Sequence, residues 1–337
     1  MGMASPELSK LVQAVVEPYL LDGPRRYSRE QVAKLSGVRS ELSRRLWISL
    51  GFAADPDDTA IEYTDADVTA VRNFKGLDVL ASADPARQSA AARTLGQSMA
   101  RLAEWQVDLV AEEIADRIRS ITAADPSADE AEVARVATEE VVSSLQALQT
   151  YAWRRHLAAA LARSLDGGAV AGDATRELAV GFADMVGYTR LTRHLDPEEL
   201  SELLESFETV TTDAITAGGG WAIKNVGDEV MFAAETAAAG ARIALAVQEA
   251  TVAAAVVPEL RVGLAYGEVL QRYGDLYGSV VNIAARLTGV ARPGTVLIDD
   301  GAAAELAGEP EFELRHLRSV RVRGISRLRS HVLRRHG

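Results

Sequence analysis

The chain has 337 residues, a net charge of −12 and no cysteine. We expect two domains, because single cores rarely grow beyond about 250–300 residues. The lack of cysteine excludes disulfides and thiolate metal sites, and the acidic balance makes nucleic acid or an anionic membrane an unlikely general partner. With no leader-like N-terminus and no run of about 20 apolar residues, we expect a cytoplasmic protein with no membrane partner.

The first half of the sequence predicts helices. Apolar residues recur every three or four positions at Leu95, Met99, Leu102, Trp105 and Leu109. The same spacing returns after an Asp-Pro-Ser turn, at Val141, Leu145, Leu148 and Ala152. This is the spacing of an amphipathic helix. We therefore expect an all-α N-terminal domain over residues 1–163, followed by a Gly-rich linker over residues 164–176.

The second half alternates between strands and helices. Strands are predicted at residues 178–184, 221–225, 229–233, 261–266 and 295–299. Helices are predicted at residues 196–216, 236–254 and 280–290, the first of them opened by Asp196 as N-cap and by Pro197. This βαββαβ order predicts an α+β ferredoxin-like domain over residues 177–337, with its helices on one face of a sheet.

Two acids in this half indicate a divalent-metal site. Asp184 ends the first predicted strand, and Asp228 follows Gly227 in the turn between the second and third strands. A hairpin beside the first strand would bring both carboxylates together, and shared carboxylates are what two-metal phosphoryl chemistry requires. Alone, each acid is explained as well by turn formation or helix capping, so the pair carries the hypothesis.

A second group of candidates lies further along the chain. Asn282 and Arg286 are four residues apart on a predicted helix and therefore share a face. Arginine suits a phosphate because its planar fork of donors stays charged. A solvated helix face with a surface arginine is the simpler alternative for this pair.

Together these segments resemble the catalytic domain of class III nucleotidyl cyclases. Phe182-Ala-Asp-Met-Val-Gly-Tyr-Thr189 is similar to the family's first metal motif, and Lys224-Asn-Val-Gly-Asp-Glu-Val-Met231 to its lysine and second metal motif. Asp275-Leu-Tyr-Gly-Ser-Val-Val-Asn282, with Arg286, resembles the motif that recognises the base and stabilises the transition state. The resemblance covers roughly residues 175–335, within the boundary error of such comparisons.

The resemblance implies a role for each matching residue. Asp184 and Asp228 would bind two Mg²⁺ or Mn²⁺ ions, and Lys224 and Asp275 would recognise the base. Asn282 would orient the ribose and Arg286 would stabilise charge on the reacting phosphate. Lysine donates and aspartate accepts, which matches N1 and the amino group of adenine, so ATP is the expected substrate and cyclic AMP with pyrophosphate the products.

The family's active sites form between two catalytic domains. The metal acids come from one domain, and the residues that contact base, ribose and phosphate come from the other. This chain carries all six residues on one catalytic domain, which implies a homodimer with two equivalent sites. Arg321 and Arg323 lie where the family often has a basic residue for the terminal phosphates, and we take Arg323 as the candidate. A solvated basic strand explains that Arg-rich segment equally well.

The segment Tyr27–Val38 raises a competing hypothesis, because it resembles the start of a helix-turn-helix. The alternative function is a nucleotide-responsive DNA-binding regulator. Charge argues against it: residues 1–165 hold 19 Lys and Arg and 24 Asp and Glu, a net of −5. Arg25, Arg26, Arg44 and Arg45 could still form a basic patch, but we prefer a helical packing unit.

The whole chain more loosely resembles a soluble actinobacterial subgroup whose helical N-terminal domain restrains the catalytic domain and responds to pH. His156 is the only histidine before the linker and lies between Trp153-Arg-Arg and Leu157. Its ordinary pKa of about 6.5 makes histidine responsive near neutral pH, so His156 is a candidate regulatory residue. A packed core histidine is the alternative, and a lipid-like ligand between the helices is a second candidate signal.

Overall fold

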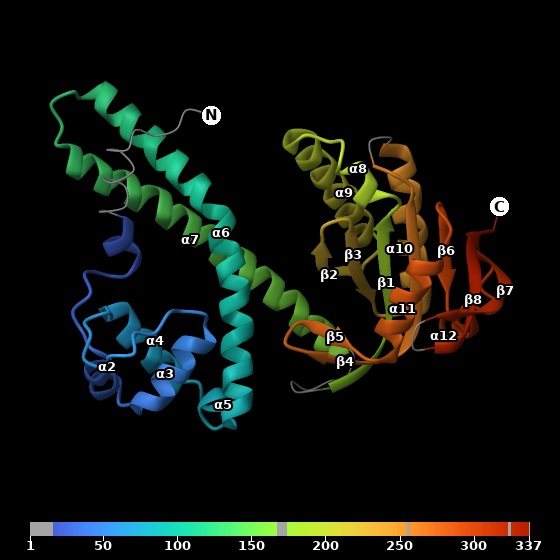
Figure 1. Cartoon of the computed structure of the whole chain (residues 1–337), viewed down its shortest axis with the longest axis horizontal. Helices are drawn as coiled ribbons and strands as arrows, with labels where there is room; N and C mark the ends of the chain where they lie inside the picture. The colour runs from blue at the N-terminus through green and yellow to red at the C-terminus, as the bar shows by residue number, and fades with distance from the viewer. Residues whose placement is uncertain (1–15, 167–173, 255–256, 323–324, 337) are drawn as a thin grey trace. The chain divides into compact units, whose positions relative to one another are not determined.

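The computed structural model describes residues 16–166, 174–254, 257–322 and 325–336 (Figure 1). The chain divides into two compact units, Met1–Ala160 and Leu161–Gly337, which we call the N-terminal unit and the catalytic unit. Within the described residues, no helix is long and apolar enough to cross a membrane.

Four short helices of the N-terminal unit form a group, which we call the head. Its members are α2 (Arg29–Ser36), α3 (Ser40–Ser49), α4 (Asp65–Lys75) and α5 (Asp78–Ala81). Ser28 starts α2 with a capping box, and Gly37 ends it in the left-handed conformation with φ of 67°. The chain then turns directly into α3, so two short helices follow Tyr27 where the sequence resembles the start of a helix-turn-helix. A β-bridge between Tyr27 and Tyr63 closes the head.

Two long helices complete this unit. They are α6 (Pro85–Ala124) and α7 (Glu130–Asp166), which form an antiparallel hairpin. Ile114 of α6 packs against Ala137 and Val141 of α7. The head joins the hairpin where α3 meets α6: a Cβ at Gly96 would lie 2.1 Å from the Leu50 carbonyl oxygen, so only glycine fits there.

The helices predicted from apolar spacing are present, but most of the predicted stripe faces outward. Leu95, Met99, Trp105 and Leu109 on α6 are exposed, and so is Leu148 on α7. A two-helix hairpin buries only the strip where its helices touch, so the rest of an apolar face needs another partner.

The catalytic unit is built on one twisted sheet. Its strands are β1 (Ala174–Met185), β2 (Trp221–Val226), β3 (Glu229–Ala234), β4 (Leu260–Arg272), β5 (Asp275–Tyr277), β6 (Thr295–Ile298), β7 (Phe312–Val322) and β8 (Ile325–Arg335). The order across the sheet is β2-β3-β1-β4-β6-β8-β7, with β5 paired to β4. Among the described strands, only β4 and β6 pair in parallel. The first four strands have the βαββαβ connectivity expected from the sequence.

Helices cover both faces of this sheet, which corrects the expectation of helices on one face. The helices are α8 (Tyr188–Leu191), α9 (Pro197–Ala217), α10 (Ala237–Ala254), α11 (Ser279–Val290) and α12 (Asp300–Glu305). α9 and α10 pack on one face, and α11 packs on the other. The reason is visible in β1, where Leu178 and Ala179 are both fully buried although neighbouring residues point to opposite faces.

Regular structure extends into both ends of the predicted linker. α7 continues to Asp166, and β1 begins at Ala174. The last turn of α7 belongs to the catalytic unit. There, the Arg163 guanidinium lies 4.7 Å from the centre of the Trp221 ring at the start of β2, and the Arg163 carbonyl accepts a hydrogen bond from Arg176 at 3.2 Å.

Candidate active site

The two candidate metal acids lie together at one end of the sheet. Asp184 is the second-to-last residue of β1, and Asp228 lies in the turn between β2 and β3. Gly227 makes this turn possible with φ of 60°. The Met185 amide donates to the Asp228 carbonyl at 3.0 Å, which fixes the turn against the end of β1. The hairpin thus brings the acids together as the sequence suggested.

The carboxylates of Asp184 and Asp228, which we call the acidic pair, affect each other's charge and lie beside one cation, Arg261. Burial raises the pKa of Asp184, the Asp228 carboxylate raises it further, and Arg261 opposes both effects. Arg261 lies directly across from Asp184 in the β1–β4 register and donates to its Oδ2 at 2.5 Å. Burial also raises the pKa of Glu229, and Asp184 and Asp228 add to that rise.

These residues fit a pair of divalent ions. Two half-buried carboxylates that repel each other offer the hard oxygen donors that Mg²⁺ and Mn²⁺ prefer. No group of three or more His, Asp or Glu ligands occurs among the described residues. The remaining ligands would therefore come from substrate phosphates, backbone and water, as is usual for Mg²⁺ at phosphates.

Lys224 and Asp275 form a second cluster, which we call the base-recognition pair after the role expected from the sequence. The Lys224 Nζ lies 3.1 Å and 2.9 Å from the two carboxylate oxygens of Asp275. Both side chains are partly open to solvent, at 43% and 32% exposure. The pair connects strands β2 and β5, and its two residues are 51 positions apart in sequence. A solvent-exposed ion pair separates at little cost, so a ligand could insert between its members.

Asn282 and Arg286 lie on the exposed side of α11. In the described chain neither side chain has a hydrogen-bonding or ionic partner. The opposite side of α11 is fixed against the sheet, where Thr288 donates to the Phe182 carbonyl at 3.2 Å. Gly263 of β4 allows this contact, because a Cβ there would lie 2.4 Å from the Thr288 amide nitrogen. A rigid helix thus presents an amide and a guanidinium to solvent.

The two remaining predicted site residues are Arg323 and His156. Arg323 lies outside the described residues. His156 is exposed on α7, so it is not a packed core histidine within this chain.

Sequence reasoning missed Arg261 and Glu229. The visible signal for Arg261 was a charge between Leu260 and Val262 in an apolar strand, but only the strand register shows that it faces Asp184. Glu229 follows Asp228 directly and was overlooked as part of the motif.

The head does not present the basic patch that Arg25, Arg26, Arg44 and Arg45 could have formed. Arg25 pairs with Glu17 and Glu62, Arg26 with Asp65, and Arg45 donates to Gln88. Three of the four arginines are therefore engaged within the head. The loop after α3 carries Asp55, Asp57 and Asp58, which would repel a phosphate backbone.

Comparison with known proteins places this geometry in a family. The model of the adenylate and guanylate cyclase catalytic domain matches residues 170–335. An adenylate cyclase of Streptomyces coelicolor is 42% identical over 291 residues, which span 86% of this chain and 74% of that protein. The chain belongs to the class III adenylyl cyclases.

Two further proteins are similar to this chain. A Mycobacterium tuberculosis protein named pH-sensitive adenylate cyclase MT1302 is 30% identical over 310 residues, covering 88% of this chain and 75% of that one. The crystal structure of the adenylyl cyclase CyaB from P. aeruginosa is 22% identical with a TM-score of 0.44, covering 48% of this chain and 95% of that chain.

Proposed function

We propose that this class III cyclase converts ATP to 3′,5′-cyclic AMP and pyrophosphate. The observation that carries the proposal is that the acidic pair and the base-recognition pair lie on the same face of the sheet. Asp184 is two residues after Phe182, and Lys224 is opposite Met231 in the β2–β3 register. Phe182 and Met231 both belong to the apolar cluster under α11. Asp184 and Lys224 therefore point to the same face of the sheet as these two residues, the face that α11 covers.

The acidic pair would hold two divalent ions, Mg²⁺ or Mn²⁺. Bound metal supplies a lowered pKa at the ribose 3′-hydroxyl and charge stabilisation at the α-phosphate. Arg261 already neutralises Asp184, and we propose that a metal at Asp184 frees this guanidinium for the substrate's phosphates. Arg261 thereby joins Arg323 as a candidate for holding the terminal phosphates.

The base-recognition pair would select adenine. Lys224 offers donors for N1, and Asp275 offers acceptors for the amino group. Guanine reverses both groups, with an acceptor at O6 and a donor at N1. Adenine would therefore replace the direct Lys224–Asp275 bond with two matched hydrogen bonds, whereas guanine would leave both side chains unpaired.

Asn282 and Arg286 would act on ribose and phosphate from across a homodimer interface. Their lack of partners among the described residues supports this arrangement, since a catalytic guanidinium needs an anion to contact. Tyr277 and Val290, which flank these two residues in sequence, have exposed apolar side chains that a second copy could cover. Val226, two residues after Lys224, is exposed in the same way. In each site, one protomer would supply the acidic pair and its partner the other four residues.

The N-terminal unit would restrain the catalytic unit in a pH-dependent manner. His156 lies exposed on α7 beside Arg154 and Arg155, so its protonation adds a third neighbouring positive charge. The last turn of the same helix contacts Trp221 on β2, the strand that carries Lys224. A cytoplasmic location fits this role and stays a prediction.

Product formation tests the proposed function directly. The full chain is incubated with ATP or GTP and Mn²⁺ or Mg²⁺, and cyclic nucleotide and pyrophosphate are quantified. We expect cyclic AMP with equimolar pyrophosphate, lost in Asp184→Asn and retained in the control Asp213→Asn, which removes an exposed charge on α9. Activity that survives Asp184→Asn would refute the metal assignment.

Comparison of pH profiles tests the regulatory role of His156. Activity of the wild type and of His156→Ala is measured across the range around the ordinary histidine pKa of about 6.5. We expect the variant to lose a transition in that range. Superimposable profiles would remove His156 as the sensor.

A further inference from the structure

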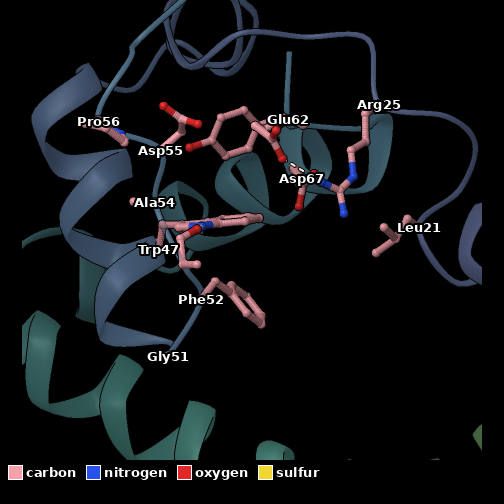
Figure 2. A pocket seen from close by; sticks show the side chains of 12 residues that line it. Leu21, Arg25, Trp47, Gly51, Phe52, Ala54, Asp55, Pro56, Glu62 and Asp67 are labelled. Atoms are coloured by element: carbon pink, nitrogen blue, oxygen red, sulfur yellow. Dashed lines mark hydrogen bonds and ion pairs between the residues drawn. The ribbon is translucent and has the colours of Figure 1, made fainter. Parts of the chain in front are cut away.

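The head contains a cavity that the proposed cyclase chemistry does not use. It has a volume of about 710 Å³ and is lined by the segment before α2, the end of α3, the loop that follows and the start of α4. Figure 2 shows Trp47 and Phe52 on one side of this cavity and Arg25 and Leu21 across from them. A volume of this size suits a small organic molecule.

One wall of the cavity is aromatic. The Trp47 ring lies 4.7 Å from the Phe52 ring and 4.9 Å from the Tyr63 ring, measured between centroids. The indole nitrogen of Trp47 donates to the Ala53 carbonyl at 2.6 Å, so the ring is fixed and its donor is already used. Phe52 is 51% exposed, a large apolar ring held in water at a cavity wall. This wall therefore offers ring surface rather than hydrogen-bond donors.

The charged groups of the lining are mainly acidic. Asp55, Glu62 and Asp67 contribute carboxylates, and Arg25 is the only basic residue among the lining residues. Arg25 is already paired with Glu62 inside the cavity and with Glu17 outside its lining. Asp55 and Asp67 have no cationic partner among the described residues. The remaining charge favours a cation and repels an anion.

The loop that carries Asp55 is held in place before any ligand binds. Arg29 is almost completely buried and donates to the Asp55 carbonyl at 2.6 Å. The Asp57 amide donates to the Asp55 carboxylate at 2.8 Å, which closes a tight turn. Asp67 is fixed by the Thr64 amide at 2.7 Å as part of the α4 capping box. A site with fixed walls binds without an added ordering cost.

We propose that this cavity binds a small organic cation: an amine with an apolar or aromatic body. The ammonium group lies between Asp55 and Asp67, and the body packs on the faces of Trp47 and Phe52. Carboxylates and the negative faces of aromatic rings attract the same charge, so the two parts of the lining reinforce each other. The nature of the ligand is set by this lining and does not depend on the chemistry of the catalytic unit.

Calorimetric titration of the full chain with three matched probes tests this assignment. The probes are 3-phenylpropylamine, 3-phenylpropanol and 3-phenylpropionate, which share one body and differ only in charge. We expect saturable binding of the amine, weakened by added salt, at least about tenfold tighter than the alcohol or the carboxylate. A carboxylate that binds as tightly as the amine, or no saturable amine binding up to millimolar concentration, would overturn the proposal.

Two pairs of variants locate the binding site. Phe52→Ala and Asp55→Asn change exposed side chains, so the fold should persist, which circular dichroism checks. We expect each to weaken amine binding by about two- to fivefold, the size of an exposed cation–π contact. The controls Tyr151→Ala and Asp108→Asn change exposed groups outside the lining and should leave affinity unchanged. Unchanged affinity in both lining variants, or equal losses in the controls, would place binding elsewhere and contradict the proposal.

Discussion

In the catalytic unit, Leu178, Phe232 and Leu264 are fully buried, whereas in the N-terminal unit Trp105 and Trp153 keep about 60% of their surface in water. The sheet of the catalytic unit has helices on both faces and so completes its own core. The largest apolar cluster of the α6–α7 hairpin that the described residues show is the small one around Ile114. Exposed apolar surface of this extent is typical of a protein interface. The comparison indicates that the catalytic unit buries its apolar side chains within its own core, while the hairpin leaves apolar side chains that another surface would bury.

The largest expected effect concerns Arg286, an exposed side chain on the well-packed unit. Arg286→Ala should lower kcat by about 100- to 1000-fold, the loss seen when one donor to a developing charge is removed. Thermal stability should stay unchanged, because the side chain is exposed and has no partner in the part of the chain that the structure describes. Arg334→Ala removes an exposed arginine of the same unit and serves as the control. If Arg286→Ala kept normal activity, the exposed side of α11 would have no part in the chemistry.

Two glycines compare the cores of the two units directly. Gly263→Ala would drive a methyl group into Thr288 and displace α11, and Gly96→Ala would drive one into the Leu50 backbone. Each should cost about 1–3 kcal/mol of unfolding free energy in its own unit. Only Gly263→Ala should also lower activity strongly at a temperature where the protein stays folded. Chemical unfolding followed by circular dichroism measures the loss of stability in each variant, and activity assays measure the loss of function. If both variants lowered activity equally, the expectation that only the core of the catalytic unit positions the active site would be wrong.

The apolar surface of α7 predicts a concentration-dependent effect. Trp153→Gln should raise the protein concentration needed for half-maximal specific activity by about tenfold or more, the size expected for a central aromatic contact. Stability of the single chain should change by no more than about 0.5 kcal/mol, because the side chain is exposed. Val252→Gln changes an equally exposed residue of the catalytic unit and should leave the assembly unaffected. Sedimentation velocity gives the same comparison without substrate, and identical behaviour of both variants would show that α7 is not an interface.

The smallest effect is a pH-dependent change in stability at Glu229. Burial, Asp184 and Asp228 raise its pKa in the folded state above the ordinary value of about 4.3. The folded protein therefore holds the Glu229 proton more tightly than the unfolded chain does. The free energy of unfolding falls as pH rises from the unfolded pKa to the folded pKa of Glu229, and it is not regained at higher pH. Glu229→Gln should thus be more stable than the wild type near about pH 7.5, with the advantage vanishing near about pH 4. Urea unfolding of the metal-free protein measures this, and a variant less stable at the higher pH would contradict the assignment.

Local signals in the sequence predicted much of the catalytic unit. Asp196 and Pro197 correctly marked the start of α9, because a cap and a fixed φ act within a single turn. Asp184 and Asp228 were found because each follows an apolar strand. Lys224 and Asp275 came from the family resemblance, and the structure brings them into contact.

Features that depend on distant contacts were not predictable. Arg261 became visible only through the β1–β4 register, which places it opposite Asp184. The second helical face of the sheet depended on α11 returning across β4, which spacing along one strand does not report. In the N-terminal unit, apolar periodicity predicted helices correctly but could not tell a buried stripe from one left open at Trp105.

Complementation between two inactive variants tests the central claim, that each active site combines residues from two copies of the chain. Asp184→Asn lacks a metal acid, and Arg286→Ala lacks the phosphate contact, so each should be nearly inactive alone. After mixing and subunit exchange, half of the dimers are mixed and each mixed dimer has one intact site, so activity should recover to about a quarter of the wild-type level. A mixture no more active than its two components would show that the acidic pair and Arg286 act within one copy of the chain, and the account would be wrong.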